Sequence, residues 1–215
     1  ATMFGVTTPA IQKAQAYLES NGYEVLVFHA TGTGGKCMES LISGGFIKGV
    51  LDLTTTEWCD EIAGGVLNAG PDRCSAAALN GVPAVVSVGA DDMVNFGPWD
   101  TVPEHYQSRN LYKHNPTVTL MRTTVEENHQ IGRAIAGKVN MSIGPCAVML
   151  PLKGVSMIDA EGQPFYGPEE DAALFQALRD EIDPTKAELI EMDAHVNDDK
   201  FAIAAAQKLI DLMNQ

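Results

Sequence analysis

The stretch from Tyr23 to Ser40, YEVLVFHATGTGGKCMES, decides how the chain folds. The β-forming residues Val25 to Phe28 are followed by a glycine turn, Thr31 to Lys36, and then by a segment of helical composition. This order is typical of a parallel α/β sheet. Glycine amides at the start of a helix also favour a bound anion, because no Cβ keeps the ligand away and the helix dipole is positive there.

The glycine turn matches neither standard phosphate-binding fingerprint in full. A Walker A loop would have glycine at Ala30 and Ser or Thr at Cys37, although Lys36 has the expected offset. A Rossmann fingerprint would have its third glycine at Cys37, although Asp52 lies close to the spacing expected of a ribose-binding acid. A tight turn between strand and helix also needs glycine for structural reasons alone, so both interpretations stay open.

Strand and helix signals alternate along most of the chain. Strands are predicted at residues 1–6, 25–28, 46–53, 84–88, 146–150 and 188–192, and helices at 9–21, after Gly35, and at 71–80, 124–139, 168–182 and 198–213. A turn signal at Asp159 to Gly162 predicts a small β-hairpin within residues 157–165. We therefore expect one α/β domain over residues 1–215, with a three-layer, mainly parallel Rossmann-like sheet, helices on both faces and a small β-hairpin insertion.

The alternation stops between Gly89 and Asn115, where Pro, Asn, Asp and aromatic residues dominate. The aromatic residues offer too much apolar surface for a disordered segment; they include Phe96, Trp99, Tyr106 and Tyr112. We expect an ordered lid or interface loop whose part from Asp91 to Asn115 closes over the glycine turn.

Composition restricts the partners. The 215 residues carry a formal net charge of -14, which disfavours nucleic acid and anionic membranes as partners. The four cysteines lack metal-ligand spacing and indicate free thiols in a reducing compartment, and no membrane span or signal peptide is evident, so a cytoplasmic location is expected. Because the chain opens directly in a predicted strand, we expect it to be the second half of a longer protein that has a preceding, N-terminal domain.

Open α/β sheets bind ligands beyond the carboxyl ends of their strands. Three residues there are candidates for acid–base roles: His29, Glu57 and His114. Packing or capping explains Glu57 and His114 as well, and it is the favoured interpretation of His29. Asp91 and Asp92 offer oxygen ligands for Mg²⁺, but a solvated turn is the favoured interpretation, and no metal site is predicted. The residues assigned to ligand binding are Thr31, Gly32, Thr33, Gly34, Gly35, Lys36, Thr54, Thr55, Thr56, Asp92, Asn95, Arg109 and Arg122.

Four stretches resemble the tomato mosaic virus resistance protein-like family: HATGTGGKCMES from His29, LDLTTTEW from Leu51, GPDRCSAAALNGVPAVVSVGADDMVNFGPW from Gly70 and RNLYKHNPTVTLMRT from Arg109. Bacterial members of that family are described as uncharacterised proteins with an ATP-binding domain and are about twice this length. The resemblance implies the second of two Rossmann-like halves, and ATP or another nucleotide, with Mg²⁺ as a candidate companion, as the cofactor. The plant member acts by binding a viral replication protein, an activity that depends on a surface and is not carried over.

Three functions remain open at this stage. The first is a nucleotide- or phosphate-binding domain with no established reaction. The second is an enzyme for a small phosphorylated or carboxylated metabolite. The third is a subunit or interaction module, a homo-oligomer included, in which a partner chain covers the aromatic residues of the irregular segment.

Overall fold

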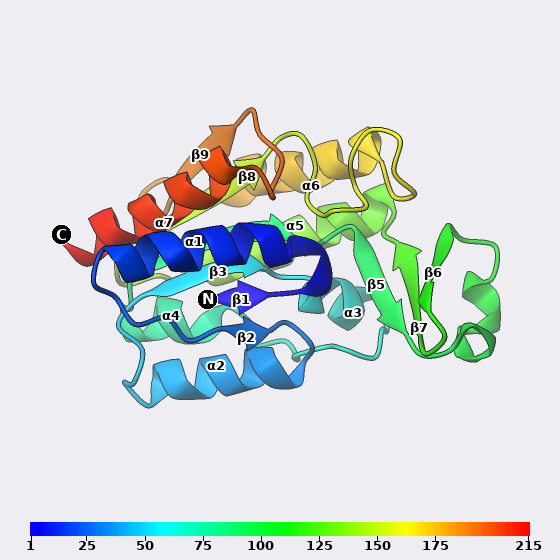
Figure 1. Cartoon of the computed structure of the whole chain (residues 1–215), viewed down its shortest axis with the longest axis horizontal. Helices are drawn as coiled ribbons and strands as arrows, with labels where there is room; N and C mark the ends of the chain where they lie inside the picture. The colour runs from blue at the N-terminus through cyan, green and yellow to red at the C-terminus, as the bar shows by residue number, and fades with distance from the viewer.

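The computed structural model describes all residues from 1 to 215 and has a parallel sheet at its centre (Figure 1). Four strands pair in parallel in the order β3, β4, β8, β9, with the bounds Val50–Thr54, Ala84–Gly89, Cys146–Pro151 and Glu188–Met192. Strands β1 (Thr2–Met3) and β2 (Phe28–His29) form a separate parallel pair, and β1 lies beside β3. The strand order therefore reverses between β1 and β3, where open α/β sheets usually bind their ligands.

Helices cover both faces of the sheet, so the expected three-layer α/β class is confirmed. Helices α1 (Thr8–Ser20) and α7 (Asp199–Met213) pack against each other on one face. The helices of the other face are α2 (Thr33–Ser43), α3 (Glu57–Ala63), α4 (Ser75–Asn80), α5 (Val125–Val139) and α6 (Pro168–Glu181). None of these helices combines the length and the apolar character needed to cross a membrane.

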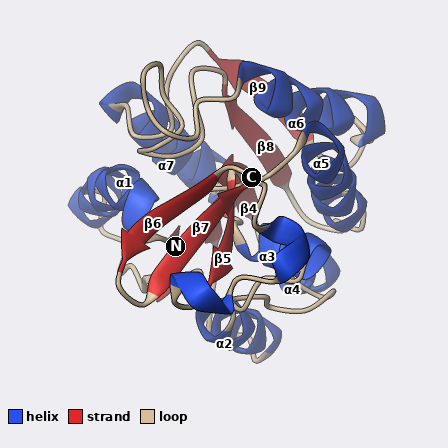
Figure 2. Ribbon diagram, turned by 90° about the vertical axis from the view of Figure 1, so that its right-hand side faces the viewer, coloured by secondary structure: helices blue, strands red, loops and turns tan.

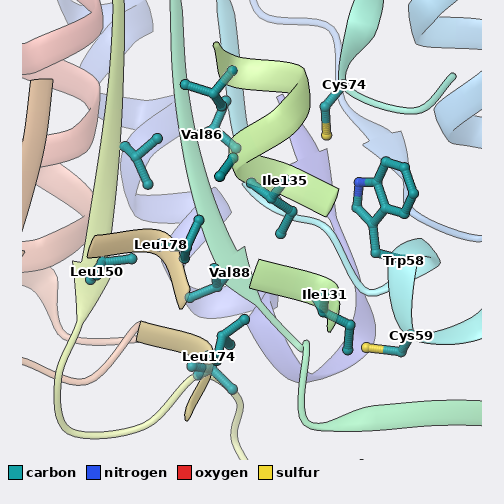
Figure 3. Packing of buried hydrophobic residues seen from close by; sticks show 14 of the residues in the cluster. Trp58, Cys59, Cys74, Val86, Val88, Ile131, Ile135, Leu150, Leu174 and Leu178 are labelled. Atoms are coloured by element: carbon teal, nitrogen blue, oxygen red, sulfur yellow. The ribbon is translucent and has the colours of Figure 1, made fainter. Parts of the chain in front are cut away.

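The central strands are apolar on both sides because both faces are covered. In β4, Val86 and Val88 belong to the larger core, whereas Val85 belongs to the smaller core beneath α1 and α7. Figure 3 shows the larger core, into which Ile131 and Ile135 of α5 project as the helical periodicity predicts.

A three-stranded antiparallel sheet lies in front of the carboxyl ends of the parallel strands (Figure 2). Its order is β5, β7, β6, with the bounds Met93–Phe96, Val118–Arg122 and Leu111–Asn115. The insertion was predicted, but its predicted position at residues 157–165 was wrong, because those residues form turns. Asp159 and Phe165 are both buried there, and the Asp159 carboxylate accepts a hydrogen bond from the N–H of Val155 over 2.8 Å, which folds the segment back on itself.

Three early strands are shorter than predicted. The first stops at Met3 and is followed by a 3-10 turn at Gly5–Thr7, and β2 pairs only two residues with β1. β3 begins at Val50, not at residue 46, because Phe46 follows the glycine pair at 44–45 and is 75% exposed outside the sheet. α4 likewise begins four residues later than predicted, after the turn that holds Arg73.

The irregular segment is ordered, as predicted, and is fastened to the domain. The hydroxyl of Tyr106 donates to the carbonyl of Ala63 at the end of α3 over 2.9 Å, and Val102 is buried. Phe96 is buried in the chain's own core, so the interpretation that a partner covers it was wrong. Trp99 keeps about half of its surface exposed at 47%.

Candidate functional site

The glycine turn lies beyond the carboxyl end of β2, beside the reversal in strand order. Gly32 has a φ of +79°, a conformation that side chains with a Cβ rarely adopt, and α2 starts at the next residue. A Cβ on Gly34 would lie 1.8 Å from the carbonyl oxygen of His29. The backbone therefore requires both glycines, whatever the turn binds.

The amides of this turn hold a carboxylate from the chain itself. The N–H groups of Gly32 and Gly35 both donate to Oε1 of Glu57, over 2.6 and 3.1 Å. Glu57 is the first residue of α3 and is 1% exposed. Converging amides at a helix start are the geometry that the sequence predicted for an anion. The turn does not face empty space, however, because Glu57 occupies it.

A buried arginine connects Glu57 to a second carboxylate. Arg73 is 1% exposed; its Nε donates to Oε2 of Glu57, and its Nη2 donates to Oδ1 of Asp52 over 2.6 Å. Oδ1 of Asp52 also accepts from the hydroxyl of Thr2 over 2.7 Å, which links β3 to β1. Arg73 also donates to the second oxygen of Asp52. Asp52 is therefore not free to bind a ribose, the role that its spacing from the glycine turn had suggested.

Glu39 of α2 is the third carboxylate around Arg73. Its two oxygens accept from the N–H groups of Cys74 and Ala76 over 2.6 and 2.7 Å, and Oε1 lies 3.3 Å from Nη1 of Arg73. No role was predicted for Arg73 or Glu39 from the sequence. The available signal was an arginine next to the small, apolar run from Ser75 to Leu79, where an unpaired charge would be unfavourable.

The three carboxylates differ in how firmly they hold their charge. Burial raises the pKa of Glu57, and the charge of Arg73 only partly opposes this rise. Burial acts on Asp52 in the same direction, but Arg73 and the hydrogen bonds outweigh it and bring the pKa of Asp52 below its ordinary value. Burial raises the pKa of Glu39 as well, against the charge of Arg73. Asp52 is therefore the stable partner of Arg73, and Glu57 and Glu39 are the carboxylates that are more easily neutralised.

The predicted threonines at the end of β3 are buried and bonded inside the chain. Thr54 shares a hydrogen bond with the hydroxyl of Thr7 over 2.8 Å, the hydroxyl of Thr55 lies 2.9 Å from Oδ2 of Asp91, and that of Thr56 donates to the carbonyl of Met93. All three are fully buried. They fix the carboxyl end of β3 and have no surface open to a ligand.

The predicted residues that follow β4 are internal too. Ser156 donates to Oδ2 of Asp92 over 2.7 Å, and the N–H of Asn95 donates to Oδ1 of Asp60 over 2.6 Å. Asp91 and Asp92 bond different partners, and no set of three His, Cys, Asp or Glu side chains is arranged to hold a metal ion.

The two predicted arginines attach the antiparallel sheet to the helices. Arg122 is 5% exposed and donates to Oδ1 of Asp171 in α6 over 2.7 Å. Arg109 pairs with Glu127 in α5 over 2.7 Å and donates to the carbonyl of Arg122. Neither arginine contacts the glycine turn.

Some predicted side chains stay accessible at the glycine turn. His29, Thr33 and Lys36 are exposed, and Thr31 is half-buried. His114 is exposed as well, but it lies on β6 beside Tyr112, in the antiparallel sheet. The structure thus brings His29, Glu57 and Lys36 to one turn and leaves His114 apart from them.

A family model described as "Uncharacterised protein family (UPF0261) C-terminal domain" matches residues 1–213. The chain belongs to this family. The UPF0261 C-terminal domain described above is 61% identical, over its whole length, to the UPF0261 protein of Clostridium tetani, of which it covers 53%. It is 50% identical over 99% of its length to a UPF0261 protein of Rhizobium meliloti, of which it covers 54%.

A plant protein is similar as well. The ToMV resistance protein Tm-1 of Solanum lycopersicum is 45% identical over 98% of this chain, which covers 28% of that protein. The resemblance to the tomato mosaic virus resistance protein-like family is thus confirmed. The chain spans about half the length of the bacterial relatives named above.

Proposed function

We propose that the glycine turn binds ATP, another nucleotide or a small phosphorylated ligand, one anionic oxygen of which replaces Oε1 of Glu57 on the amides of Gly32 and Gly35. The supporting observation is the convergence of these two N–H groups on one oxygen, in the first turn of a helix of 11 residues. Carboxylate and phosphate oxygens accept the same charge-assisted hydrogen bonds. The position beside the reversal in strand order also supports a ligand site.

Glu57 keeps the turn formed while no ligand is bound. Because burial already raises the pKa of Glu57, its removal from the amides gives up a carboxylate that is poorly solvated there. Arg73 stays paired with Asp52 when Glu57 leaves, and its Nε becomes free for the incoming anion. Lys36, exposed in the first turn of α2, supplies a second positive charge. Mg²⁺ would then be brought by the nucleotide and not by a protein site.

A thermal-shift titration with ATP and ADP, with and without Mg²⁺, tests this proposal. We expect both nucleotides to raise the midpoint temperature of thermal unfolding. Glu57→Gln should tighten binding about 10-fold, because an uncharged side chain competes less for the amides and does not repel the ligand. Lys36→Met should weaken binding. Lys200→Met, which removes an exposed charge on α7, on the other face of the sheet, is the matched control.

The titration is run on the chain alone and on a fusion that carries the preceding half of the Clostridium tetani relative, because this chain covers only 53% of that relative. If the nucleotides change the unfolding temperature of neither protein, ligand binding is rejected. If the nucleotides raise the unfolding temperature but Glu57→Gln and Lys36→Met do not alter this rise, the ligand binds elsewhere. The glycine turn is then rejected as the binding site.

An enzyme for a small phosphorylated or carboxylated metabolite is a second candidate. The observation that favours it is a glutamate of raised pKa beside the exposed His29, since acid–base catalysts commonly have such pKa values. Once a substrate is found by screening, His29→Ala and Glu57→Gln should lower turnover at least about 100-fold. His114→Ala, remote from the turn, is the control, and full turnover in both site variants rejects these roles.

A further inference from the structure

The opposite edge of the sheet, where the parallel strands begin, carries exposed apolar surface. A hollow of about 380 Å³ opens there, and most of the residues that line it are apolar. Among them are Leu26, Phe46 and Ile47, together with Leu209 and Met213 of the last helix. This edge lies at the end of the molecule that carries the C-terminus, away from the antiparallel sheet (Figure 1).

A second hollow continues this surface along the starts of β3 and β4. It is open, has a volume of about 350 Å³ and shares Ile47 and Lys48 with the first hollow, but polar residues and glycines form most of its lining. Its far side is formed by Gly81 and Pro83, and Gly81 lies against Ile143, which is 72% exposed. We call this continuous surface the amino-edge face; it comprises Leu26, Phe46, Ile47, Pro83 and Ile143.

The relatives indicate what covers this face. The matching family model describes a C-terminal domain, and this chain covers only 53% and 54% of two bacterial relatives. Those relatives therefore have about as much chain again before the part that matches Ala1. Ala1 itself lines the first hollow, and its nitrogen donates to the carbonyl of Leu26 over 2.7 Å. A preceding domain would enter along the amino-edge face.

We propose that the amino-edge face is the docking surface for the domain that precedes this one in the longer relatives. A contiguous apolar patch on a soluble domain usually marks an interface. Two copies of this chain, each with a net charge of -14, repel each other, whereas a covalently linked domain is held at high effective concentration. This inference is independent of ligand binding at the glycine turn, which lies at the other edge of the sheet.

Thiol labelling tests the proposal directly. Cys37 is the exposed one among the four free cysteines, so Cys37→Ser gives a background without an exposed thiol. Into this background Phe46→Cys is introduced, and Val66→Cys, at another exposed apolar position beside α3 and β5, serves as the control. The maleimide reaction rate is measured for each variant in the chain alone and in the fusion with the preceding half of the Clostridium tetani relative.

We expect Phe46→Cys to react at least about 10-fold more slowly in the fusion than in the chain alone, and Val66→Cys to react equally fast in both. Equal rates for Phe46→Cys in the two proteins overturn the proposal. Slow labelling of Phe46→Cys in the chain alone that becomes faster on dilution also overturns it, because a second copy then covers the face.

Discussion

At the scale of single residues, Arg73 holds the site together. It joins carboxylates from β3 and α3 and lies against α2, so one guanidinium ties three elements to the sheet edge. A buried ion pair adds little net stability compared with apolar packing, but removal of one partner leaves an uncompensated buried charge. Loss of Arg73 should therefore destabilise the domain strongly.

Arg73→Met should lower the free energy of unfolding by about 3–5 kcal/mol, because Asp52 and Glu57 would remain buried without a counter-charge. Urea denaturation followed by circular dichroism measures this. Arg133→Met, which removes an exposed pair with Glu181, is the control and should change stability by less than about 1 kcal/mol. A similarly small effect for Arg73→Met would show that the buried network is dispensable.

Asp60 gives the domain a pH dependence. It is fully buried and accepts from the N–H groups of Leu67 and Asn95, and burial raises its pKa to about 7. The unfolded chain releases this proton near pH 4, so between about pH 4 and 7 the folded state binds more protons than the unfolded state. Stability therefore falls as pH rises through this window.

Asp60→Asn should remove up to about 1.4 kcal/mol per pH unit from the slope of unfolding free energy against pH between pH 5 and 6.5. Chemical denaturation at several pH values gives this slope. Asp92 and Asp171, whose pKa values are also raised, contribute in the same direction and are left unchanged. Asp100→Asn, at an exposed position, is the control; if Asp60→Asn has the wild-type slope, Asp60 is ionised in the folded protein.

At the scale of elements, helix α5 shows how glycine decides the approach of two helices. Gly132 faces α6, and a Cβ there would lie 2.7 Å from the Cβ of Ala177 and 2.8 Å from the carbonyl oxygen of Leu174. Gly137, one and a half turns later in the same helix, has open space around it. Both glycines lie inside the same helix, but only Gly132 is in close contact with another helix.

Gly132→Ala should destabilise the domain by about 1–3 kcal/mol, because the helices must separate to admit the methyl group. Gly137→Ala should stabilise it by about 0.5–1 kcal/mol through helix propensity. Urea unfolding of both variants provides the comparison, and each variant is the control for the other. If both variants change the free energy of unfolding by the same amount and in the same direction, the close packing of α5 on α6 is contradicted.

The elements also differ in how well the sequence predicts them. Several later strands and helices matched their predicted bounds closely, as β9 and α7 do. The early strands did not, because β2 pairs only with the short β1 and because Phe46 has apolar character but no strand partner. The insertion was misplaced because a buried Asp159 next to apolar residues gives the same pattern as a hairpin turn.

At the scale of the whole molecule, the two edges of the parallel sheet differ. The carboxyl edge is filled by the antiparallel sheet and by buried polar networks around Arg73 and Arg122, and the glycine turn opens at its side. The amino edge is open, and its first hollow is mostly apolar. We expect ligand chemistry at the first edge and domain assembly at the second.

The sequence by itself determined the α/β class, the three layers and the turn in which amides converge, because hydrophobic period and glycine position are local properties. It also pointed to the family. Only the tertiary structure decided which group accepts hydrogen bonds from those amides. Glu57 and Arg73 are separated from the turn along the chain and reach it through the packing of β3, α3 and α2, and no local pattern records such contacts between distant segments.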